Sequence, residues 1–177
     1  TAMSIPAGIH HADLLSAGLG LEGLRSMTPP AIANPAAPTA EELRRRALWT
    51  NWRGIADLSP GGGFTEIYGS LAAVAGREFQ ALRRIPGASQ PHRVMAQVPD
   101  GFDARARCLV VAVSSGSRGV YGAIALAGAW GLPRGCAVAY TDKGAGSDWI
   151  ELGSSKRRAI DGRLGAAAQP TFVPAGS

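Results

Sequence analysis

The residues best suited to chemistry in this chain are the small ones of a Ser/Gly loop at 114–119. An apolar run at 108–113 precedes this loop, and an alanine-rich segment leads from it to a second apolar run at 136–140. This pattern predicts a strand, a loop, a crossover helix and a parallel strand, with the loop at the carboxyl end of the first strand. The backbone N–H groups of such small residues can hold an anion or the oxyanion of an acyl-transfer reaction.

Two enzymatic roles fit this loop. In the first, the backbone of Ser115, Gly116, Ser117, Arg118 and Gly119 binds the oxyanion of a tetrahedral intermediate, and the positive end of the following helix strengthens the field. In the second, Ser117 is itself the nucleophile of an incomplete G-x-S-x-G turn, in which Ser115 stands where the first glycine belongs. The spacing favours the oxyanion role.

A third role belongs to a different class, a dinucleotide-binding module. Gly116, Gly119 and Gly122 lie between the strand and the helix, and Asp142 ends the next strand, where a ribose-binding acid would lie. The spacing is G-x-x-G-x-x-G, which does not encode the tight first turn of that motif. We therefore rank this module second to the oxyanion-binding role.

The histidines limit what the chain can do alone. No histidine follows His92, so a serine in the 114–119 loop could not precede its histidine in the serine, acid, histidine order of α/β-hydrolases. His10 and His11 have no third ligand at the spacing of a metal site, and the chain has 2 cysteines. We expect no metal and no cofactor, and we interpret the chain as the front part of an enzyme.

The surrounding elements must position the loop. Strands are predicted at 78–85 and 93–98, joined by a turn at 86–89, and two further strands at 109–113 and 137–140 are predicted at the buried centre of a parallel sheet. This order matches the opening half of an α/β-hydrolase sheet. We predict an α/β fold with a helical and loop segment at 1–75 and the incomplete hydrolase domain at 76–177. In the first segment, Thr39 and Glu42 form a capping box that starts a helix ending before Ser59-Pro60.

Cys108 and Cys136 open the two apolar runs at equivalent places. Neighbouring strands lie about 4.8 Å apart, a spacing that a disulfide can bridge, and the alternative is two buried thiols. A bridge would indicate an extracytoplasmic compartment.

Composition excludes some classes of partner. The net charge is +5, but the basic residues are spread along the chain without interleaved aromatic residues, which argues against nucleic acid. No apolar run reaches about 18 residues, so no membrane span is expected.

Several separate stretches carry a family resemblance. They are residues 13–20, 48–53, 59–63, 67–69 and 97–99 and, most specifically, Ser114 to Ile124 followed by 135–144. On these stretches the chain resembles the N-terminal part of the D-3-hydroxybutyrate oligomer hydrolases. The resemblance implies a secreted or periplasmic serine esterase that cuts soluble D-3-hydroxybutyrate oligomers to the monomer.

The resemblance also implies that the serine nucleophile, acid and histidine lie beyond residue 177. The chain alone would then be inactive and would pair with a second chain carrying the C-terminal part. Its ligand would be a small ester oligomer. Arg118 would either bind the terminal carboxylate or fix the loop through backbone carbonyls, and Tyr121 would either line the acyl pocket or pack in the core. The alternatives to this esterase are the nucleotide-binding module and a non-catalytic companion chain.

Overall fold

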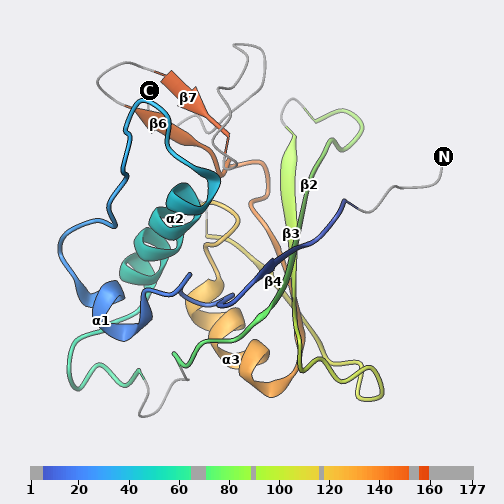
Figure 1. Cartoon of the computed structure of the whole chain (residues 1–177). Coiled ribbons are helices and arrows are strands. Elements are labelled where there is room, and N and C mark those ends of the chain that lie inside the picture. Colours follow the sequence, from blue (N-terminus) through green and yellow to red (C-terminus); the bar gives the residue numbers. More distant parts are fainter. Residues whose placement is uncertain (1–5, 65–70, 89–90, 116–117, 152–155, 160–177) are drawn as a thin grey trace.

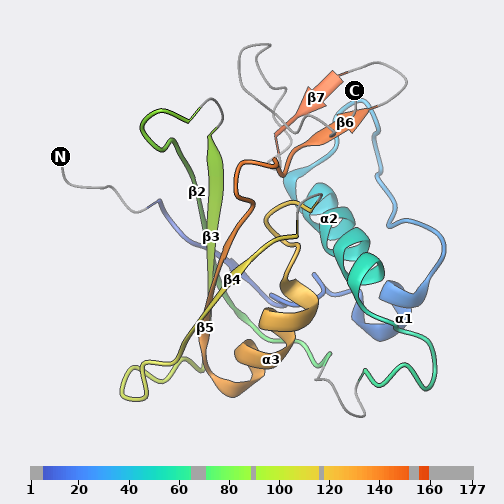
Figure 2. The same ribbon diagram turned by 180° about the vertical axis from the view of Figure 1, so that it is seen from behind.

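An open five-stranded sheet with the long helix and the crossover helix on one side dominates the computed structural model, which describes residues 6–64, 71–88, 91–115, 118–151 and 156–159 (Figures 1 and 2). The elements in chain order are β1 (Ile9–His11), α1 (Gly20–Arg25), α2 (Ala40–Ile55), β2 (Gly76–Arg83), β3 (His92–Pro99), β4 (Leu109–Val113), a π-helical turn η1 (Ile124–Gly128), α3 (Ala129–Gly131), a 3-10 turn η2 (Leu132–Arg134), β5 (Ala137–Thr141), β6 (Trp149–Glu151) and β7 (Lys156–Arg158). None of the described helices is long and apolar enough to cross a membrane.

The sheet order is β1-β2-β3-β5-β4. β2 and β3 form the predicted antiparallel hairpin, β5 pairs antiparallel with β3, and β4 pairs in parallel with β5. β1 was not predicted from the sequence. It joins the sheet beside β2, with Ile9 opposite Glu78, so the N-terminal segment contributes a strand as well as helices.

β4 corrects one prediction. We expected 109–113 at the buried centre of the sheet, but in the described structure β4 is the last strand, and β5 is the strand beside it. Leu109, Val111 and Val113 are 61%, 71% and 59% exposed. β5 does lie inside the sheet, with Val138 and Tyr140 buried. An apolar run predicts that a strand will be covered, but it does not say which segment of a protein covers it.

The core lies between the sheet and the helices. α2 presents Leu48 and Trp52 to it, the N-terminal segment adds Leu14 and Leu15, and the crossover adds Ile124, all of them fully buried. The Trp52 indole N–H donates to the Leu15 carbonyl at 2.8 Å, which satisfies its polar atom inside the core. The segment before residue 75 and the sheet therefore share one hydrophobic core.

The capping box at the start of α2 is confirmed. The Glu42 backbone N–H donates to Thr39 Oγ1 at 3.2 Å, and Glu42 Oε2 accepts from the Thr39 backbone N–H at 2.8 Å. These contacts satisfy two donors at a helix end that would otherwise lack partners.

Replacing Thr39 with alanine is expected to lower the free energy of unfolding by about 1 kcal/mol, because the Glu42 amide loses its acceptor. Urea unfolding followed by circular dichroism measures this difference. Thr39→Ser keeps the hydroxyl and is expected to remain close to the parent protein. Equal losses from both substitutions would contradict the role given to the cap.

The crossover helix lies where it was predicted but differs in type. Instead of one α-helix, the chain forms the π-helical turn η1, a short α3 and the turn η2. Gly128 explains the close packing, because a Cβ at this position would lie 2.7 Å from the Tyr140 hydroxyl of β5. The helix can approach the sheet only because glycine stands there.

A buried ion pair connects α2 with the sheet. Arg44 Nη2 lies 3.2 Å from Glu78 Oε2, and the two side chains are 6% and 4% exposed. The remaining acceptor capacity of Glu78 is used by Tyr121 Oη, which donates at 2.5 Å, and by the amides of Gln97 and Gln80 at 3.0 and 2.9 Å. We call these five residues the Glu78 network.

Three of the groups whose pKa is lowered bury much of their charge and make stability sensitive to acid. Burial raises the pKa of Glu78 and of Asp13, but the Arg44 charge in the first case and hydrogen bonds from Ser16 and backbone amides in the second outweigh it, so both pKa values lie below the ordinary range. Burial and the Arg44 charge lower the pKa of His11. In all three cases the unfolded chain binds protons more readily than the folded chain.

Stability is therefore expected to decline as the pH falls below about 6.5, where His11 first contributes, and more steeply below about 4.5, where the two carboxylates contribute. Urea midpoints measured from pH 8 to pH 3 test this profile. In the double variant Asp13→Asn/His11→Gln, the urea midpoint should depend less on pH. A midpoint that rises on acidification would contradict the predicted loss of stability in acid.

Candidate functional site

The candidate site is formed by two loops that leave the carboxyl ends of β4 and β5. Because these strands are parallel neighbours, the segment after Val113 and the segment after Thr141 begin at the same edge of the sheet. Ser114 N–H donates to the Thr141 carbonyl at 3.0 Å and extends the ladder into the first loop. Ligands in open α/β sheets bind outside the carboxyl ends of strands, so this edge is the place to look for a site.

Asp142 holds the two loops together. Its buried carboxylate accepts from the Arg93 backbone N–H at 2.8 Å, from the Gly144 N–H at 2.9 Å and from the Ser147 hydroxyl at 2.8 Å. Ser147 Oγ in turn accepts from the Val120 N–H at 2.9 Å. The chain from Asp142 through Ser147 to Val120 thus fixes the second loop against the first.

Replacing Asp142 with alanine is expected to lower the free energy of unfolding by about 2–3 kcal/mol, since the buried Arg93 amide and the half-buried Gly144 amide lose their acceptor. The Val120 amide should also exchange its hydrogen faster, because Ser147 is no longer held in place. Urea unfolding and amide exchange measure the two effects. Lys143→Ala, at the exposed neighbouring position, should change stability by less than about 0.5 kcal/mol.

The described part of the first loop is tightly packed. A Cβ at Gly119 would lie 3.1 Å from Ser147 Cα, so the second loop approaches the first at this glycine. The Arg118 N–H donates to the Ser115 carbonyl at 3.2 Å, and the Val120 N–H donates to Ser147 Oγ, so neither amide is a free donor. Ser115 is exposed. Gly116 and Ser117, which complete the predicted oxyanion loop, lie outside the described residues.

Arg118 binds the C-terminal end of α2. Its guanidinium donates to the carbonyls of Thr50 and Gly54 at 3.3 and 3.1 Å. The Gly54 carbonyl belongs to the last turn of α2, whose carbonyls have no partner within the helix, and a cation there also interacts favourably with the helix dipole. These contacts are those of the structural alternative for Arg118. They hold the 114–119 loop against an element from the N-terminal segment.

Tyr121 is buried, with 1% of its surface exposed, and its hydroxyl belongs to the Glu78 network. Burial, and then the nearby Glu78 carboxylate, raise the pKa of Tyr121 well above its ordinary value, so the phenol keeps its proton and donates it. This geometry favours packing over the alternative role of Tyr121 in lining an acyl pocket.

The structure argues against Asp142 as the acidic ribose ligand of the dinucleotide-binding alternative. Asp142, the proposed ribose ligand, is 2% exposed, and its carboxylate oxygens bind the two backbone amides and the Ser147 hydroxyl described above. The helix that should hold a pyrophosphate at its N-terminus is also replaced by a π-helical turn followed by the three-residue α3. The geometry therefore argues against a nucleotide site, and the loop also lacks the following helix whose positive end was expected to strengthen its field.

A disulfide joins Cys108 and Cys136, whose Cα atoms are 4.7 Å apart. It lies just before β4 and β5, at the end of these strands opposite to the two loops. It therefore fixes the strand pair from one end, while Asp142 connects the loops at the other. In the described part of the chain, no group of three His, Cys, Asp or Glu residues could hold a metal ion.

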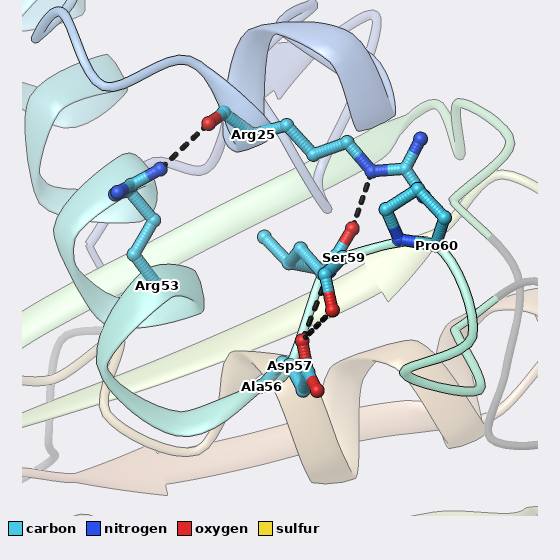
Figure 3. Close-up of a pocket in the computed structure, with 7 residues that line it drawn as sticks. Arg25, Arg53, Ala56, Asp57, Ser59 and Pro60 are labelled. Atoms are coloured by element: carbon cyan, nitrogen blue, oxygen red, sulfur yellow. Dashed lines mark hydrogen bonds between the residues drawn. The ribbon is translucent and has the colours of Figure 1, made fainter.

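A cavity of 390 Å³ lies beside the end of α2 and is lined by Arg25, Arg53 and the segment 56–60 (Figure 3). Its arginines already have acceptors: Arg53 Nη1 donates to the Arg25 carbonyl at 2.8 Å, and Arg25 Nε donates to the Leu58 carbonyl. Gly61 and Gly63 of the following loop have φ values of 84° and 91°, which side chains rarely allow. We interpret this region as a turn held in place by these hydrogen bonds rather than as an anion-binding site.

Sequence reasoning missed Ser147, which connects the two loops, and Glu78, which is the centre of the buried network. Ser147 had a local signal, because it follows Asp142 by five positions in a glycine-rich loop. Glu78 had none, since its partner Arg44 is 34 residues away and a single carboxylate in a strand predicts nothing by itself.

Comparisons with known proteins identify the family that this chain matches. The family model described as 3HB-oligomer hydrolase matches residues 7–172. Two similar relatives are named D-(-)-3-hydroxybutyrate oligomer hydrolase. The relative from Paraburkholderia xenovorans is 49% identical over 163 residues, which are 86% of this chain and 23% of the relative. The relative from Cupriavidus metallidurans is 48% identical over 176 residues, which are 91% of this chain and 24% of the relative.

This chain therefore spans about a quarter of the length of the relatives that it matches. No solved structure matches it significantly.

Proposed function

Because this chain belongs to the 3HB-oligomer hydrolase family, we propose that it forms part of a serine esterase that cuts short, soluble D-3-hydroxybutyrate oligomers to the monomer. The observation that carries the proposal is the family match over residues 7–172, which includes both loops of the candidate site. The chain corresponds to only 23–24% of the relatives named above. On the family resemblance, the nucleophilic serine, the acid and the histidine are assigned to the rest of the protein, C-terminal to this chain.

The topology supports an α/β-hydrolase assignment. β2 and β3 form a hairpin, and the crossover from β4 then places β5 between β3 and β4. If β2, β3 and β4 are the first three strands of such a sheet, the segment after β4 is the loop that supplies an oxyanion N–H in that fold. That segment is 114–119, the loop selected from its composition.

The proposed reaction is acyl transfer. The serine attacks the ester carbonyl while the histidine takes its proton, and amides of the 115–119 loop other than that of Arg118 donate to the oxyanion. Collapse of this intermediate breaks the ester bond, and the histidine returns the proton to the departing hydroxyl group. Water then attacks the acyl-enzyme in the same way and releases the carboxylate. A single oxyanion donor typically contributes about 10²- to 10³-fold to the rate.

Arg118 is proposed to position this loop. It belongs to the loop and binds the end of α2, so it fixes the loop without contacting the ester. The disulfide between Cys108 and Cys136 supports a secreted or periplasmic location, since such bridges persist in oxidising compartments.

A chimera tests the proposal. This chain would replace the matching quarter of the C. metallidurans relative, and release of D-3-hydroxybutyrate from its dimer and trimer would be measured. We expect the chimera to hydrolyse both oligomers and the 177-residue chain alone to be inactive. The unmodified relative is the positive control.

The other outcomes distinguish the alternatives. Activity of the chain alone that disappears in Ser117→Ala would make Ser117 the nucleophile. A folded chimera that hydrolyses neither oligomer would contradict the proposed function and favour a non-catalytic companion.

A further inference from the structure

The two edges of the sheet are built differently. β1, at one edge, is a three-residue strand with two histidines, and His10 Nε2 lies 2.9 Å from Asp100 Oδ2. Short, polar edge strands of this kind resist pairing with another chain. β4, at the other edge, has the sequence Leu-Val-Val-Ala-Val, without a charge or a proline. The β4 edge lacks the usual protection against pairing.

The amides of β4 alternate between the two sides of the strand. Ala137 N–H donates to the Cys108 carbonyl, and Ser114 N–H donates to the Thr141 carbonyl. In a parallel ladder this pattern directs the amides of even-numbered residues toward β5 and those of Leu109, Val111 and Val113 toward the open edge. These three amides can therefore report on anything that pairs with the edge.

The side chains of β4 leave an apolar sheet face open. Leu109, Val111 and Val113 share a face with Ala137, Ala139 and Thr141, their register partners in β5. α2 and α3 lie on the other side of the sheet (Figures 1 and 2). Parallel strands are normally covered on both faces. In the described structure the β4–β5 pair is covered on one face only.

An apolar groove borders the same strand on the helix side. This cavity of 720 Å³ is lined by Ile55, Phe64, Val110, Leu126 and Trp130, among others. Leu126 and Trp130 are 65% and 49% exposed. Val110 belongs to β4, so the open edge, the open face and the groove are parts of one continuous surface, which we call the β4 surface.

We propose that the β4 surface is where the remaining three quarters of the polypeptide docks, with a strand paired to β4 and an apolar segment in the groove. This inference rests on the proposed function, because it takes the relatives' additional length as the occupant. That length is available, since the chain covers 24% of the C. metallidurans relative. A parallel strand added beside β4 must return through a crossover, and crossover helices cover sheet faces.

Amide hydrogen exchange tests the pairing in the chimera described above. In the 177-residue chain, the amides of Leu109, Val111 and Val113 should exchange quickly, while those of Val110 and Ala112 are protected. In the chimera, exchange at the three odd-numbered positions should slow by at least about 100-fold. Unchanged exchange at these positions in the chimera would overturn the proposal. Protection that appears in the chain alone and rises with its concentration would assign the surface to a second copy instead.

Substitutions provide a second readout. Val111→Lys and Leu126→Glu should lower the thermal midpoint of the chimera by several degrees yet shift that of the chain alone by less than about 2 °C. Ile85→Lys and Ile85→Glu are the matched controls, because Ile85 is 58% exposed in the β2–β3 turn. Equal shifts from the Ile85 and β4-surface variants of the chimera would overturn the proposal. Neither measurement depends on hydrolysis, so a chimera that is inactive but protected would separate failure of the function from failure of the docking.

Discussion

Replacing Glu78 with leucine is expected to lower the free energy of unfolding by about 3–5 kcal/mol, the largest effect of any single substitution considered for this chain. The Arg44 guanidinium is 6% exposed and would lose the carboxylate at 3.2 Å. A buried charge without its partner retains its full desolvation cost. The Tyr121 hydroxyl and the Gln97 amide would lose the same acceptor. Urea unfolding monitored by tryptophan fluorescence measures the difference.

Two variants isolate the cause of this loss. Glu41 lies 3.7 Å from the same arginine, but its side chain is 47% exposed, so Glu41→Gln should cost less than about 1 kcal/mol. Arg44→Met combined with Glu78→Leu removes both charges and should recover much of the lost stability. A double variant as unstable as Glu78→Leu would show that packing, rather than an uncompensated charge, dominates.

Removing the disulfide is expected to have the second largest effect. Replacing Cys108 and Cys136 with alanine opens a loop whose ends are 28 residues apart, and the loss of this constraint on the unfolded chain should cost about 3–4 kcal/mol. Because β5 is the described neighbour of β4, the loss should appear first as faster amide exchange in β4. Urea unfolding and exchange test both parts.

Reduction provides the matched control. The parent protein in reductant should unfold at nearly the same urea concentration as the double variant, and reductant should not affect the double variant. A parent midpoint that does not respond to complete reduction would contradict a stabilising role for the bridge.

What the sequence predicted correctly depended on short spacings. Thr39 and Glu42 are three residues apart, and the apolar runs at 109–113 and 137–140 each form a strand, so local chemistry was sufficient for them. The hairpin followed from its turn residues. The Ser/Gly loop could be assigned to the carboxyl end of a strand for the same reason.

What the sequence could not predict depended on distant partners. Ile9 pairs with Glu78 across most of the N-terminal segment, and Arg44 reaches Glu78 from another element, so neither residue carries a local signal. The apolar residues of β4 correctly indicate a strand that needs cover. They could not show that the described chain leaves that strand at an edge. The irregular crossover depends on glycine contacts with β5, which appear only after folding.

Gly54 and Arg118 are 64 residues apart in the chain, yet they constrain each other. A Cβ at position 54 would lie 2.0 Å from the Arg118 guanidinium, which occupies the space beside this glycine. Any side chain at position 54 would therefore displace the arginine, and a shorter residue at position 118 would remove the reason for glycine at position 54. Among related sequences, these two positions should covary, with glycine at 54 accompanying arginine at 118 and larger residues at 54 accompanying its loss.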